Sequence, residues 1–218
     1  MNSPVLQLLV LAGIAVFLIL RLRSVLGTRE GHEPTREVQG PPKQRTHNLE
    51  VIEGGPDHDI VDHVPEGSET AAALADMKRV EPSFGVTDFL GGARGAYEMI
   101  LMAFERGEVE DMRPFLSEDV YNSFAEVIAI REEKGLTIEA DFIGIRDMTL
   151  SSAAFDSATR TAEITVKFVG ELVSVVRGPD GEIIEGEPGK SKRQKDVWTF
   201  ERVMGADDPN WRLVATGE

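Results

Sequence analysis

The feature that most constrains this chain is a continuous apolar run near its beginning. Residues Val5 to Leu20 are apolar except for Gln7, and Arg21 and Arg23 follow almost at once. A helix rises about 1.5 Å per residue, so residues 4–20 extend roughly 25 Å, close to the ~30 Å hydrocarbon core of a bilayer. The remaining apolar residues up to position 26 lengthen the run if both arginines extend their charged ends to the interface. We predict a transmembrane anchor over residues 1–26.

The charges around this run favour an anchor over a cleaved signal peptide. A signal peptide has cationic residues before its apolar run and small residues at a cleavage site after it, whereas here no Lys or Arg precedes Val5. Arg21, Arg23 and Arg29 should stay on the cytoplasmic side. We therefore expect a single-pass protein with its amino terminus outside and the rest of the chain in the cytoplasm.

Residues 27–68 have the composition of a disordered linker. They contain six Gly, five Pro and no Phe, Tyr or Trp, so they offer little apolar surface to offset the entropy lost on folding. The four histidines of the chain, His32, His47, His58 and His63, all fall in this segment. A metal site there would have no fold to hold its ligands, so we predict no metal and no cofactor.

Residues 69–218 are predicted to form one domain, which is acidic. They carry 17 Lys and Arg against 29 Asp and Glu, and this balance argues against binding to nucleic acid. They contain no His and no Cys, the residues that most often supply acid–base, nucleophilic and transition-metal chemistry. We therefore expect a binding domain and not an enzyme.

The hydrophobic pattern predicts helices first and strands afterwards. Apolar residues recur every three or four positions in residues 69–80, in a longer helix from Thr87 to Gly107, and in a third from Ser117 to Gly135. The period then becomes two, with a slip near Gly144 that indicates a bulge, and strands follow at residues 162–176, 197–203 and 211–215. This order predicts an α+β fold, with helices packed on a bent antiparallel sheet.

Two stretches of this domain resemble a known family. The first reads FLGGARGAYEMI at residues 89–100, followed by Gly107 and by LSEDVY at residues 116–121; the second reads DVWTFER at 196–202, with DPNW at 208–211 and LVAT at 213–216. Together they resemble the Tim44-like domain, which is the domain of the adaptor subunit of the mitochondrial inner-membrane import motor and of its bacterial relatives.

This resemblance implies a cone-shaped fold similar to nuclear transport factor two, a place at the bacterial inner membrane and an adaptor role. The expected partners are the membrane and an unidentified membrane or client protein, in a process linked to protein translocation or membrane-protein assembly. A chaperone is one candidate partner. However, the long region that engages the channel and chaperone in the mitochondrial adaptor is replaced here by the anchor and linker.

Two groups of residues are candidates for contact with lipid or a partner. Lys190, Lys192, Arg193 and Lys195 form a basic cluster that could bind anionic head groups, although a solvated hairpin has the same pattern. Leu74, Met77 and Phe84 give the first helix an apolar side that could insert partly into a bilayer. An anionic-lipid-binding module is therefore an alternative to the protein adaptor.

Two further motifs favour structural over chemical roles. Gly91-Gly92-Ala93-Arg94-Gly95 looks like a phosphate loop, but the helical period runs through it, so we interpret its small residues as a surface for close helix packing. Asp141, Tyr97 and Tyr121 are the candidates for proton transfer if the domain were a small-molecule enzyme. The pattern instead predicts that Asp141 lies on the outer face of a strand and that both tyrosines lie in the core.

Overall fold

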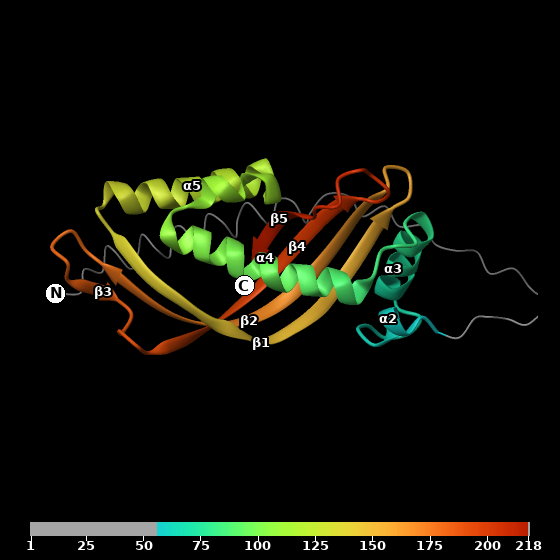
Figure 1. Ribbon diagram of the computed structural model, residues 1–218, viewed down its shortest axis with the longest axis horizontal. Coiled ribbons are helices and arrows are strands. Elements are labelled where there is room, and N and C mark those ends of the chain that lie inside the picture. Colours follow the sequence, from blue (N-terminus) through green and yellow to red (C-terminus); the bar gives the residue numbers. More distant parts are fainter. Residues whose placement is uncertain (1–55, 218) are drawn as a thin grey trace, which may run out of the picture. The chain divides into compact units, whose positions relative to one another are not determined.

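The computed structural model describes residues 56–217 and places helices against one face of a long antiparallel sheet (Figure 1). The helices are α2 (His58–Val61), α3 (Glu69–Val80), α4 (Val86–Arg106), the 3-10 helix η1 (Val109–Phe115) and α5 (Glu118–Glu133). The strands are β1 (Thr137–Asp156), β2 (Thr161–Arg177), β3 (Ile183–Glu185), β4 (Ser191–Val203) and β5 (Arg212–Gly217). The predicted α+β class is therefore confirmed.

The predicted anchor, residues 1–26, and residues 27–55 of the predicted linker lie outside the described residues. Within residues 56–217, no helix combines the length and the apolar character that crossing a bilayer requires. The membrane anchor therefore stays a prediction from sequence.

The sheet has the strand order β1-β2-β4-β5, with the short strand β3 also paired to β2, and all pairs are antiparallel. The pairing of β1 with β2 shifts register at three places, the first between Phe142 and Gly144. This confirms the slip predicted near Gly144. Bulges bend a strand, and Figure 1 shows β1 and β2 curving beneath α4.

The core lies between α4 and the face of the sheet that it covers. Alternate residues of β2, among them Ile164, Val166 and Phe168, are buried beneath the helix. Tyr97 of α4 is fully buried and stacks on Phe168 with 4.4 Å between ring centroids. Burying one such side chain contributes about 1.5–3 kcal/mol, so this layer of aromatic residues holds the helix on the sheet.

The folded part begins before residue 69, which is the start predicted from the sequence. Residues 58–61 form α2, and the side chains of Ile60 and Val64 are buried in the same core as α3 and α4. The predicted linker therefore extends too far toward the domain. His58 and His63 also belong to the folded part, where His63 Nε2 lies 3.2 Å from Thr87 Oγ1.

Candidate protein-binding groove

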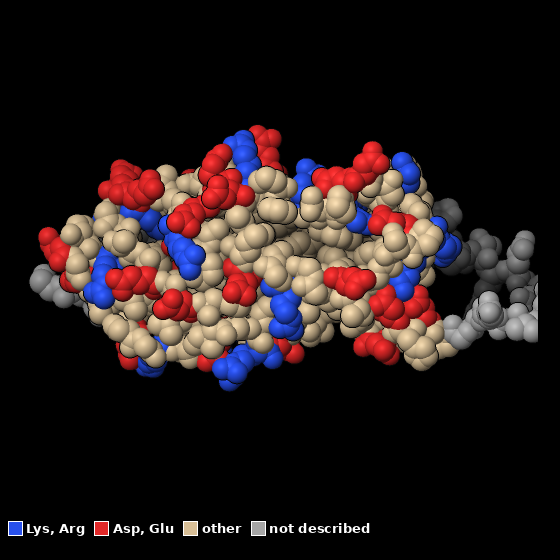
Figure 2. Space-filling view, in the orientation of Figure 1, with Lys and Arg blue, Asp and Glu red and all other residues tan. Residues whose placement is uncertain are grey.

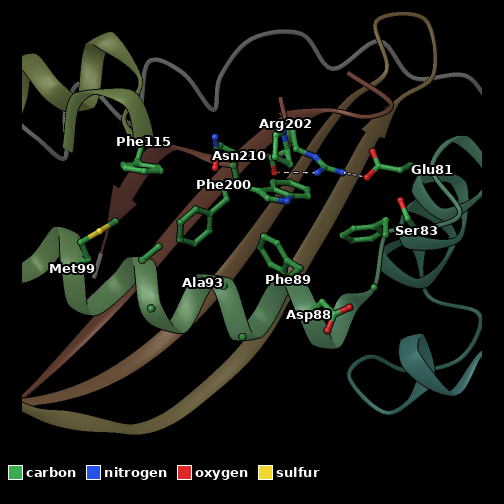
Figure 3. Close-up of a pocket in the computed structure, with 18 residues that line it drawn as sticks. Glu81, Ser83, Asp88, Phe89, Ala93, Met99, Phe115, Phe200, Arg202 and Asn210 are labelled. Carbon is green, nitrogen blue, oxygen red and sulfur yellow. Dashed lines mark hydrogen bonds and ion pairs between the residues drawn. The ribbon is translucent and has the colours of Figure 1, made fainter. Parts of the chain in front are cut away.

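An open groove runs along the side of α4 that the sheet leaves uncovered. Its volume is about 490 Å³, and its lining comes from the α3–α4 connection, α4, η1, β4 and the turn before β5 (Figure 3). Figure 2 shows the hollow above α4 lined mainly by uncharged atoms, with acidic and basic side chains scattered around it. No group of three or more potential metal ligands occurs among residues 56–217.

The floor of the groove is bare helix backbone. Gly91, Gly92 and Gly95 are exposed on α4, and a Cβ atom added to any of them would meet no atom within 4 Å. No element of the described residues packs on these glycines, so the close helix packing predicted for them has no partner within residues 56–217 and stays a prediction. Each glycine in a helix costs about 1 kcal/mol relative to alanine, and no turn or internal contact here requires one.

Aromatic side chains of α4, β4 and the turn before β5 form a wall of the groove. Phe89 of α4 contacts Trp211 and Phe200, with centroid distances of 4.7 Å and 5.9 Å. Phe84 lies 6.0 Å from Trp211, and Phe115 of η1 and Met99 of α4 border the far end of the groove. The side chain of Met99 is 38% exposed, whereas methionine side chains are more often buried. The groove therefore combines apolar side chains with bare helix backbone.

An ion pair closes one end of the groove. Arg202 Nη2 lies 2.6 Å from Glu81 Oε1, and the guanidinium lies over the ring of Trp211 at 5.2 Å. Burial alone would raise the pKa of Glu81, but hydrogen bonds from the Gly205 N–H and from Arg202 outweigh it and lower that pKa. The other lining carboxylate, Asp88, forms no ion pair with the described residues.

A family model described as the Tim44-like domain matches residues 70–218. The chain belongs to the Tim44-like family. The resemblance read from residues 89–121 and 196–216 is thereby confirmed.

The curated relatives are mitochondrial import inner membrane translocase subunits TIM44. The human protein is 29% identical and the rat protein 27% identical over 150 residues, and subunit TIM44-1 of Arabidopsis thaliana is 22% identical over 152 residues. Each match covers 67% of this chain, which spans only about a third of the length of these relatives. Among solved structures, the intermembrane space region of chloroplast protein ARC6 matches with a TM-score of 0.40 and 11% identity over 59% of this chain and 94% of that one.

In the Tim44-like domain, the residues of the predicted basic cluster do not all lie on one face of β4. Lys190 precedes the strand and pairs with Glu187 at 3.0 Å. Lys192 lies on the same face as the buried Asp196, whereas Arg193 and Lys195 point to the opposite, outer face. All four are exposed, so contact with lipid or a partner stays a prediction for them.

The three apolar residues predicted to insert into a bilayer are instead part of the core of the domain. Leu74 and Met77 of α3 are 0% exposed, and Phe84 is 7% exposed where it borders the groove. The prediction of membrane insertion is wrong for this structure, because the apolar side of α3 packs on β1. Helical periodicity indicated a buried face correctly but did not indicate what covers it.

The Tim44-like domain does not bring the three candidate proton-transfer residues together. Tyr97 is enclosed in the core and donates a hydrogen bond to Asp196 at 2.5 Å. Tyr121 lies on α5 and bonds to Glu110, and Asp141 is exposed on β1. Tyr97 and Asp141 lie where the pattern predicted them, whereas Tyr121 is only partly buried beside the core and its hydroxyl makes an exposed hydrogen bond. The groove itself was not predicted, because the sequence does not show that this face of α4 stays uncovered in the described residues.

Proposed function

We propose that this chain is a membrane-anchored adaptor that holds its Tim44-like domain at the cytoplasmic face of the bacterial inner membrane and binds another protein through the groove. The relatives support a link to protein translocation, because their names describe them as subunits of an inner-membrane translocase. The role we propose is binding without catalysis.

The observation that carries this proposal is the bare face of α4. Gly91 and Gly95 are four residues apart, so they lie on one face of the helix and leave its backbone open over a full turn. A second helix can approach such a face more closely than it can approach ordinary side chains. The aromatic wall formed by Phe89 and Trp211 would then bury the apolar side of that helix.

The chemistry of the lining also restricts the partner. The walls are apolar, so the bound segment needs an apolar side that faces Phe200 and Met99. Asp88 lies at one end of the floor without an ion pair among the described residues, so a basic residue near that end of the segment would gain a favourable contact. We propose an amphipathic helical segment of a client or membrane protein.

The test is site-specific photocrosslinking of the full chain in native membranes. A photoreactive residue replaces Met99, which is partly exposed at the groove, and crosslinked proteins are identified by mass spectrometry. The variant Gly95→Leu should abolish these crosslinks, because its side chain fills the groove from an open position on α4. Ala129→Leu likewise places a leucine at an exposed site, on α5, and should leave them unchanged. Crosslinks that persist with Gly95→Leu would contradict docking in the groove.

The anchor and its orientation need a separate measurement. A reporter that is active only in the cytoplasm, fused after Glu218, should be active, and a reporter that works only in the periplasm should be silent. Activity of the periplasmic reporter would overturn the orientation and with it any cytoplasmic partner.

A further inference from the structure

Part of β4 has a partner strand on only one of its two edges. Strand β2 pairs with β4 along its whole length, from Ser191 to Val203. Strand β5 pairs only with the stretch Val197–Glu201. On the side of β5, residues 191–196 therefore have no strand beside them within the described chain, and we call this stretch the open edge of β4.

The open edge is basic although the domain as a whole is acidic. Lys192, Arg193 and Lys195 are exposed and form no ion pair within 4.0 Å among the described residues. Arg193 lies opposite Glu171 of β2 and its charge is among the causes that lower the pKa of that carboxylate, but the hydrogen bonds to Glu171 come from Arg146 and Ser191. Three cations are therefore available to a negatively charged partner.

These cations lie on both faces of the sheet, which restricts the shape of the partner. Side chains alternate along a strand, so Lys192 extends from the helix-covered face and Arg193 and Lys195 from the outer face. A flat surface placed against either face would meet only part of the set. An extended peptide placed along the edge would lie between the two groups and could contact all three.

The open edge is also held in place before anything binds. Asp196 accepts hydrogen bonds from the buried Tyr97 hydroxyl at 2.5 Å and from Gln194 Nε2 at 3.0 Å. The bond from Tyr97 connects the end of the open edge to α4, and the pairing with β2 holds its other side. Because the edge is already ordered, binding of a peptide strand does not have to order it, and the loss of conformational entropy on binding is smaller than with a flexible edge.

We propose that the open edge of β4 binds an extended acidic segment of another protein, which adds to the sheet as a further strand. Backbone hydrogen bonds would supply affinity, and the three cations would select acidic side chains. A second copy of this chain docking edge to edge would place like charges opposite one another, which is unfavourable. This site is separate from the groove, so it would give the adaptor a second point of attachment.

The experiment uses the full chain in an uncharged detergent and a fluorescein-labelled acidic peptide, Glu-Val-Glu-Glu-Thr-Glu-Val-Glu. Fluorescence anisotropy measures binding, and amide hydrogen exchange measures protection of residues 191–196. The variant Lys192→Gln/Arg193→Gln/Lys195→Gln removes the three charges. The control variant Arg94→Gln/Arg106→Gln/Lys134→Gln removes three exposed charges of other elements that form no ion pair among the described residues.

We expect the peptide to bind, to slow exchange at residues 191–196 and to bind about tenfold more weakly to the first variant, a difference of about 1.4 kcal/mol. The control variant should bind at least five times more tightly than the first variant. A fully N-methylated peptide keeps the charges, but it cannot donate to the carbonyl groups of the edge and its methyl groups prevent close pairing of the strands, so it should not protect the edge. Equal binding by both variants, or no slowing of exchange at the edge, would overturn the proposal. The proposal would also be overturned if the wild-type chain bound vesicles of anionic lipid and not the peptide, and if the first variant lost that binding to vesicles.

Discussion

The Asp59 carboxylate caps helix α4 from 27 residues earlier in the chain, accepting a hydrogen bond from the backbone N–H of Val86 at 2.7 Å. It also accepts one from the N–H of Thr87 at 2.9 Å. The residue at the usual capping position, Gly85, has no side chain to do this. Lys78 of α3 lies 2.7 Å from the same carboxylate, so three separate segments meet at the start of the groove helix.

Replacement of this cap should destabilise the domain. We expect Asp59→Ala to lower the free energy of unfolding by about 1–2 kcal/mol, because two N–H groups at the helix terminus lose their acceptor. Denaturant unfolding would measure the change, and amide exchange should accelerate in the first turn of α4. Asp62→Ala, at an exposed residue that forms no ion pair in the described part of the chain, should stay within about 0.5 kcal/mol of the wild type.

The same contact should make stability depend on pH in acid. Burial alone would raise the pKa of Asp59, but hydrogen bonds from Lys78 and from the N–H groups of Thr87 and Val86 outweigh it and hold that pKa well below its usual value. The unfolded carboxyl takes up its proton near pH 3.9. The stabilisation is therefore complete above about pH 4 and declines as the pH falls below it. Asp59→Asn keeps an acceptor for the cap and should show a shallower loss of stability in acid titrations.

The domain start shows why part of this fold could not be predicted from the sequence. Residues 56–68 contain four acidic residues, two Pro and no aromatic residue, so their composition predicts a linker. Their order comes from Asp59 reaching α4 and from Ile60 packing in the core, and both contacts depend on partners distant in sequence. By contrast, the long amphipathic helices and the alternation in β2 carry their own local signal, and they were predicted.

Substitution of the glycines in the groove floor by alanine should stabilise the domain, whereas substitution of a glycine in the core should destabilise it. Gly91→Ala, Gly92→Ala and Gly95→Ala should each raise the free energy of unfolding by about 0.5–1 kcal/mol, because the helix is favoured and the added methyl group has space. Gly170→Ala should be destabilising, because its Cβ would lie 2.6 Å from the Tyr97 hydroxyl oxygen. Thermal melts of the four variants give the comparison. Destabilisation by Gly95→Ala would mean that the floor serves the fold itself.

The candidate site was predicted only in part, for reasons that these residues show. The sequence places Gly91 and Gly95 on one helix face, but it does not show that no other element covers that face. The open edge of β4 was assigned partly to a loop, because residues 190–195 have no apolar alternation and are ordered by the backbone of β2. Phe89 and Trp211 are 122 positions apart, and only the folded sheet brings them within 4.7 Å.

Truncation of α3 should show that its apolar side supports the core. Leu74 is fully buried, so we expect Leu74→Ala to lower the free energy of unfolding by about 2–5 kcal/mol. Val80 lies on the same helix but is 38% exposed, and Val80→Ala should cost much less. Urea unfolding of both variants makes the comparison. If Leu74→Ala left stability unchanged and reduced binding to vesicles, α3 would contact lipid as first predicted from its periodicity.

The last prediction concerns the bond between Tyr97 and Asp196, which connects the groove helix to the open edge of β4. Tyr97→Phe keeps the ring that stacks on Phe168 but removes the hydroxyl, so a buried carboxylate loses a donor. We expect the free energy of unfolding to fall by about 1–3 kcal/mol. Asp196→Asn keeps an oxygen that accepts this hydrogen bond and removes a buried charge, so it should cost less.

A second measurement distinguishes this connection from a general loss of stability. Burial first, and then the bond to Asp196, raise the pKa of the Tyr97 phenol, so the phenol stays protonated and able to donate at any physiological pH. Amide exchange at residues 194–196 should therefore speed up in Tyr97→Phe more than exchange at residues 198–200, which β5 still holds on their other edge. Uniform acceleration along β4 would show that the tyrosine stabilises the core without fixing the open edge.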